Sequence, residues 1–159
     1  MSKRKAYRPR AARIDALTLA IQGQAKLTQA DQEAMAAPVK LAVEQISKGL
    51  GTQADWQAIF DVVNILDRFV TMPTVMRNGA DYLSTLQGVI VGILDRQKRT
   101  GSKALYPAEL EDLRGMVELW QEILSVVTHR EYFQSEERAH KKLLTVLRGG
   151  HPSAKVIDL

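Results

Sequence analysis

The hydrophobic positions along this chain recur every three or four residues, which is the spacing of one face of an α-helix. The pattern is most regular near the middle of the second half, at Leu110, Leu113, Val117, Trp120, Leu124 and Val127. No segment alternates apolar and polar residues as a half-buried strand would. The sequence therefore predicts an all-α fold, a single-domain bundle of five or six helices with mostly antiparallel neighbours.

Capping residues and helix-terminating residues set the expected helix boundaries. Thr28 and Thr128 each precede a carboxylate by three residues, a capping-box pattern, and Thr52 is a further N-cap. Pro38 falls inside the second helix and predicts either a kink or two short helices. The expected helices cover residues 14–23, 28–48, 52–70, 79–99, 107–127 and 128–149.

Three expectations about packing follow from the same pattern. The helix over 79–99 has the widest apolar face, which predicts that it is the central and most buried element. Its Gly88 and Gly92 form a GxxxG pair, which indicates a close approach of a neighbouring backbone. The short connection at Thr128 predicts that the last two helices pack as an antiparallel hairpin.

The chain divides by charge into a basic arm over 1–13, a helical bundle over 14–150 and a loose tail over 151–159. The arm contains six basic residues and no acidic one, namely Lys3, Arg4, Lys5, Arg8, Arg10 and Arg13. The whole chain carries 22 basic and 18 acidic residues, a net charge of +4, so residues 14–159 carry −2. Like charges at this density repel one another unless an anionic partner is present.

The composition excludes several chemistries. Without cysteine, the chain has no disulfide, thiolate-ligated metal or thiol nucleophile. Glu137 and His140 form one ExxH pattern, but a di-iron bundle needs two, so neither a metal nor a cofactor is expected. Asp61, Asn64, Asp67 and Arg68 share one helix face, which we interpret as solvated. The absence of phosphate-loop, nucleophile-elbow and zinc-protease motifs favours a non-enzymatic protein, with no catalytic residues assigned.

No apolar run approaches the roughly 20 residues that cross a bilayer, and no signal-peptide core follows the basic N-terminus. We therefore expect no membrane association and a location in the cytoplasm.

Nucleic acid is the partner that the arm favours, because phosphates would neutralise its cations, and Tyr7 among them could stack on a base or sugar. A secondary set of basic contacts is Arg96, Lys98, Arg99, Lys103, Lys141 and Lys142. Cations in a last helical turn also have a structural role, since they complement the helix dipole. The arm could instead be a solubilising tail, or it could bind an acidic protein. It could also lie on the acidic helix expected over 107–127 of its own chain or of a sister subunit, which leaves a homodimer open.

The arm Lys3-Arg4-Lys5-Ala6-Tyr7-Arg8-Pro9-Arg10 resembles the KRKxYRPR opening of small, mostly uncharacterised helical proteins of proteobacterial phages, prophages and plasmids. The resemblance implies a mobile-element accessory protein in a bacterial host cell, and it carries over no catalytic or ligand residue.

The sequence thus predicts an accessory or regulatory protein that binds nucleic acid through its basic arm, with DNA favoured over RNA. The alternative is a phage-borne inhibitor of a host enzyme or defence complex, such as a CRISPR effector, that binds a host protein through charged helical surfaces. An acid-rich helical hairpin over 107–137, with a net charge of −6, could occupy the nucleic-acid channel of such a host protein by mimicry.

Overall fold

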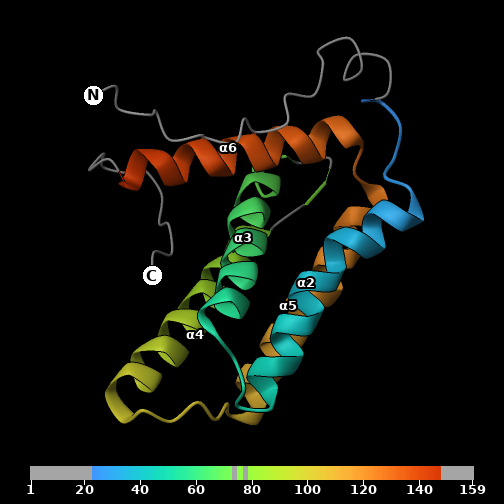
Figure 1. Cartoon of the computed structure of the whole chain (residues 1–159). Coiled ribbons are helices and arrows are strands. Elements are labelled where there is room, and N and C mark those ends of the chain that lie inside the picture. The colour runs from blue at the N-terminus through green and yellow to red at the C-terminus, as the bar shows by residue number, and fades with distance from the viewer. Residues whose placement is uncertain (1–22, 73–74, 77–78, 148–159) are drawn as a thin grey trace, which may run out of the picture.

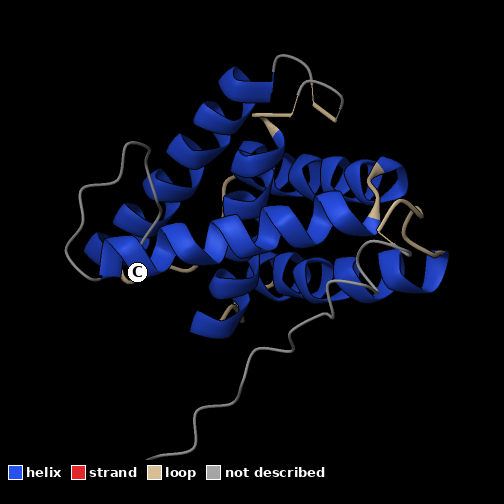
Figure 2. Ribbon diagram, turned by 90° about the horizontal axis from the view of Figure 1, so that it is seen from above, coloured by secondary structure: helices blue, strands red, loops and turns tan. Residues whose placement is uncertain are grey.

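The computed structural model describes residues 23–72, 75–76 and 79–147. These residues form five helices: α2 (Gln29–Ser47), α3 (Gln53–Phe69), α4 (Gly79–Thr100), α5 (Pro107–Val126) and α6 (His129–Leu147). Figure 2 shows helices and loops but no strand among them, so the predicted all-α fold is confirmed. The arm over 1–13, most of the predicted helix over 14–23 and the tail over 151–159 lie outside the described residues.

Helices α2 to α5 run alternately up and down and form a four-helix bundle (Figure 1). α2 packs most extensively against α3 and α5, and α4 completes the ring against the same two helices. α6 crosses one end of the bundle and packs on α3 (Figure 1). Within the described residues, no helix combines the length and the apolar character that crossing a bilayer requires.

The predicted N-caps are present. Thr28 and Thr52 each accept a hydrogen bond from the backbone N–H three residues on, and Asp31 and Asp55 reach back to the cap N–H. Thr128 and Glu131 make the same pair of bonds at the start of α6. Each box satisfies backbone donors that the first helical turn leaves unpaired, which is why these short sequence signals locate the helix starts well.

α2 is one continuous helix with Pro38 inside it, so of the two expected outcomes, a kink or two short helices, the second is wrong. Pro38 and Ala34, whose carbonyl loses its helical donor at the proline, are both exposed. Water can therefore donate to the Ala34 carbonyl in place of the missing N–H. The buried face of α2, where Val39 is 1% exposed, faces away from this site.

The most buried helix is α3 rather than α4, which corrects the expectation from the sequence. Eight α3 side chains are buried, because α3 packs against α2, α4 and α6. Val62 and Ile65 are among these buried side chains and widen the buried face of α3. On α4, by contrast, Val89 and Leu94 are only partly buried at the edge of the core.

The GxxxG pair of α4 does not mediate a close helix approach within the described residues. Gly88 and Gly92 are both exposed, and a Cβ built on either would meet no atom within 4 Å. The two glycines lie on one face of α4, as the GxxxG spacing predicts, but that face points to solvent.

α5 and α6 do not form the antiparallel hairpin that the sequence predicted; α6 turns away across the end of the bundle (Figure 1). The segment before α2 is hydrogen-bonded to the connection between α5 and α6. The Leu27 N–H donates to the Val127 carbonyl at 3.4 Å, and the His129 N–H donates to the Ala25 carbonyl at 3.0 Å. These bonds fix extended backbone between the two helices, and Val127 is fully buried there, so the chain cannot fold back along α5.

Candidate functional site

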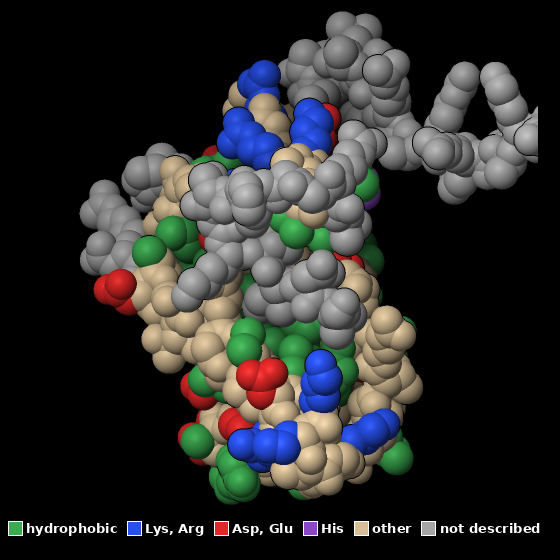
Figure 3. All heavy atoms as spheres, turned by 90° about the vertical axis from the view of Figure 1, so that its left-hand side faces the viewer, with side chains coloured by type: hydrophobic (Ala, Val, Ile, Leu, Met, Phe, Trp, Pro, Cys, Tyr) green, Lys and Arg blue, Asp and Glu red, His purple; other side chains and the backbone are tan. Residues whose placement is uncertain are grey.

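The principal predicted site, Lys3, Arg4, Lys5, Tyr7, Arg8, Arg10 and Arg13, lies outside the described residues. The six secondary cations are described, and they fall at opposite ends of the bundle. Arg96, Lys98, Arg99 and Lys103 lie at the end of α4 and in the loop after it, whereas Lys141 and Lys142 lie on α6. Figure 3 shows Lys and Arg side chains at both ends of one face, with hydrophobic side chains between them. The structure therefore does not bring the six together.

Arg96 is engaged within the fold. Its guanidinium donates two hydrogen bonds to the Glu109 carboxylate, and one at 2.9 Å to the Ala104 carbonyl. It also lies 4.1 Å from the centroid of the Tyr106 ring. The hydrogen bond from Arg96 lowers the pKa of Glu109, so this carboxylate keeps its charge to a lower pH than an unpaired glutamate does. Arg96 therefore joins the end of α4 to the start of α5.

The other cations at this end are more accessible. Lys103 donates from Nζ to the Gly51 carbonyl at 3.1 Å, which ties the α4–α5 loop to the α2–α3 turn. Lys98 and Arg99 are exposed in the last turn of α4, where they complement the helix dipole. No ion pair within the described residues engages either of them.

The two lysines of α6 have different environments. Lys141 forms an exposed pair with Glu137 at 2.9 Å, one helical turn away. Lys142 is only 18% exposed at its side chain and contacts Asp67 Oδ2 at 3.1 Å, beside the Arg68–Asp67 pair. Asp67 and Arg68 are thus partly buried against α6, so the prediction of a fully solvated face is wrong for them. Sequence periodicity could not show this, because it depends on where α6 crosses α3.

A cleft of about 200 Å³ lies between α3 and α6. It is lined by Asp61, Asn64, Ile65, Glu136, Ala139, His140 and Leu143. Burial raises the pKa of Glu136, the Asp61 carboxylate adds to the increase, and His140 opposes it. Burial likewise raises the pKa of Tyr132, next to the same two carboxylates, to about 12. The cleft therefore disfavours further negative charge.

The ExxH pattern of α6 contributes His140 and Glu137, but only His140 lines this cleft. Among the residues that the structure describes, no group of three His, Asp or Glu side chains is placed to hold a metal ion. His129 instead packs on Phe133 and approaches Asp31 at 3.8 Å, which helps to join α6 to α2.

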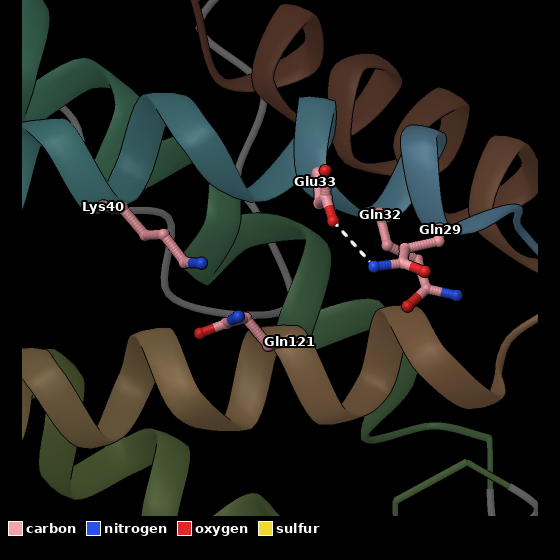
Figure 4. Close-up of a pocket in the computed structure, with 5 residues that line it drawn as sticks. All are labelled: Gln29, Gln32, Glu33, Lys40 and Gln121. Carbon is pink, nitrogen blue, oxygen red and sulfur yellow. Dashed lines mark hydrogen bonds between the residues drawn. The ribbon is translucent and has the colours of Figure 1, made fainter.

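A larger groove of about 460 Å³ runs between α2 and α5 (Figure 4). Figure 4 shows Lys40 and Gln121 on opposite sides of it, with Gln29 and Gln32 farther along. Gln29 donates to Glu33 at 2.9 Å, so much of the polar lining is internally paired. The groove is open to solvent and is lined by both charge signs. Sequence periodicity carries no signal for it, because its two walls are more than 80 residues apart.

Comparison with protein-family models, with curated proteins and with solved structures finds no match to this chain.

Proposed function

We propose that this protein is a non-enzymatic accessory or regulatory protein of a bacterial mobile element and that it binds nucleic acid through residues 1–13. The observation that carries the proposal is the separation of charge along the chain. The arm contains six cations and no acid, whereas the remaining residues carry a net charge of −2. A partner rich in phosphate would neutralise the arm, and counterion release would drive binding.

The environments of the described cations support the view that the arm, and not the helical body, is the main anion-binding segment. Arg96 and Lys142 are held in ion pairs with side-chain exposures of 15% and 18%. A cation that already has a carboxylate partner gains little from a phosphate, because the first interaction must be broken. The arm is therefore the main anion-binding segment in this proposal, and the exposed cations at the end of α4 come second.

The inhibitor alternative rested on an acid-rich hairpin over 107–137. That hairpin is not formed, and two of its acids have structural roles: Glu109 binds Arg96, and Glu131 caps α6. The acids of α5 that remain exposed are Glu111, Asp112, Glu118 and Glu122. A stoichiometric host protein recovered from lysate after nuclease treatment would favour the inhibitor.

The salt dependence of DNA binding tests the proposal. If the arm neutralises five or six phosphates of a duplex, log K against log[salt] has a slope of about −4.5 to −5.4. Replacing Arg8 and Arg10 together by Ala should flatten the slope by about two units and weaken binding to all sequences alike.

The matched control removes two exposed cations, one from α2 and one from α5, that line a second hollow between these helices: Lys40→Ala with Arg114→Ala. This double variant should leave the slope unchanged. Binding that does not depend on salt, or an equal change of slope in the two double variants, would contradict the proposal.

A further inference from the structure

An exposed aromatic ring lies within a strongly basic stretch at the end of the bundle opposite α6. Tyr106, the residue before α5, is 61% exposed, the second most exposed of the large hydrophobic residues that the structure describes. Between residues 96 and 106 the chain contains four cations and no acid. An isolated exposed tyrosine needs no explanation, but one surrounded by cations is typical of surfaces that bind nucleic acid.

The Tyr106 ring is held in place from one side. The Arg96 guanidinium lies 4.1 Å from the ring centroid, and Glu109 fixes that guanidinium through two hydrogen bonds. Glu109 also accepts a hydrogen bond from the backbone N–H of Tyr106 at 2.7 Å. One carboxylate thus positions both the ring and the cation beside it, so a ligand would pay little conformational entropy to use the ring.

Cations suited to phosphate precede the ring in sequence, in the last turn of α4 and in the α4–α5 loop. Lys103, three residues before Tyr106, is held near the α2–α3 turn by its bond to the Gly51 carbonyl. Lys98 and Arg99 extend from the last turn of α4. Figure 3 shows Lys and Arg side chains together at the lower end of the face that it views, where α4 ends. The acids nearest in sequence are Asp95, which precedes the stretch, and Glu109, which is occupied by Arg96.

We propose that Tyr106 is a stacking platform for an unpaired base of single-stranded nucleic acid, with Lys98, Arg99 and Lys103 on the flanking phosphates. A base inside a duplex is covered on both faces by its neighbours, so only an unpaired base can stack on a side chain. The inference rests on the proposed function and adds a site that the arm does not contain. Platform and arm share no residue, so they can be altered separately.

Fluorescence anisotropy with the full chain tests the platform. The probes are a labelled 16-nucleotide DNA strand and its duplex, and the variants are Tyr106→Ala and Tyr106→Phe. Tyr106→Ala should weaken single-strand binding about tenfold, the effect of losing one stacked base, and change duplex binding less than about twofold. Tyr106→Phe keeps an aromatic ring and should bind the single strand like the parent protein.

Two controls separate stacking from charge and from misfolding. A strand of equal length with abasic sites throughout keeps the phosphates, so the parent protein and Tyr106→Ala should bind it equally. Thermal unfolding by circular dichroism should show that Tyr106→Ala is folded, because the backbone N–H that bonds Glu109 remains. Replacing Lys98, Arg99 and Lys103 by Ala should flatten the single-strand salt slope by about two units.

An equal loss on single strand and duplex, or a loss on the abasic strand as well, would overturn the platform. If Tyr106→Ala has no effect while Arg8→Ala with Arg10→Ala abolishes binding, the platform is wrong and the arm proposal stands. If Tyr106→Ala weakens binding and the arm variants do not, the platform stands and the arm proposal is wrong.

Discussion

The basic side chains of this fold have different roles, and the exposed fraction of each side chain distinguishes those roles. Arg96 makes a two-pronged contact with Glu109, and each side chain is only 15% exposed. Lys141 is 69% exposed, and its pair with Glu137 one turn away contributes little to stability. A count of charges along the sequence treats these residues alike, whereas only the exposed ones remain available to an anionic ligand.

Glu136 should make the folded protein less stable as the pH rises. Its pKa is raised in the folded state by burial and by Asp61, so the folded state holds its proton to higher pH than the unfolded chain does. Between the unfolded pKa near 4.5 and the raised value, the free energy of unfolding falls as the pH increases. Glu136→Gln removes the titrating group and should raise the melting temperature at pH 7, with the gain shrinking as the pH approaches 4.5.

The neighbouring residue provides the control. The hydrogen bond from Lys141 lowers the pKa of Glu137, so its contribution has the opposite sign: it is present at pH 7 and is lost as the pH falls through the lowered value. Glu137→Gln should therefore lower the melting temperature slightly at pH 7. A lower melting temperature for Glu136→Gln at pH 7 would show that the carboxylate is stabilised in the cleft rather than disfavoured.

On the scale of an element, α4 has glycines that its packing does not require. Gly88 and Gly92 lie in the helix interior with open space at their Cβ positions. Alanine restricts the unfolded chain and favours the helix, so Gly88→Ala and Gly92→Ala should each stabilise by about 0.5–1 kcal/mol. Thermal and urea unfolding should show both gains, and the gains should add.

Gly101 is the control for this prediction, because it has φ +71° at the end of the same helix. Gly101→Ala should destabilise by about 1 kcal/mol despite the open space around it, since a Cβ is strained in that conformation. If alanine at 88 and 92 were destabilising instead, the face would be in use as a helix contact with a second copy of the chain.

The sequence predicted correctly those features that depend on neighbouring residues, such as the helix caps. It did not predict those that depend on contacts between distant segments. The caps at Thr28, Thr52 and Thr128 depend on residues three positions away, and the structure confirms all three. The crossing of α6 depends on the bonds between residues 25–27 and 127–129, which are about 100 positions apart. The partial burial of Asp67 against Lys142, 75 positions away, follows from the same kind of long-range placement.

At the scale of the whole molecule, one continuous hydrophobic core joins the helices, and every described helix contributes side chains to it. Trp120 of α5 and Phe60 of α3 are almost fully buried, and Tyr132 brings α6 onto the same core. Apolar contacts of this extent stabilise a fold independently of its net charge. Stability should therefore reside in the helices, and the charge of residues 1–13 should serve binding.

Deleting residues 1–13 separates the two properties. The deletion removes six cations and none of the residues of the described core, so the melting temperature should change little. The remaining chain carries −2 and should bind duplex DNA only weakly at low salt, because few phosphates would be neutralised. Anisotropy and thermal unfolding on the same preparation measure both. A large fall in melting temperature would show that the arm packs on acidic residues of its own chain, such as Glu118 and Glu122. Unchanged DNA affinity would show that the helices, and not the arm, bind the phosphates.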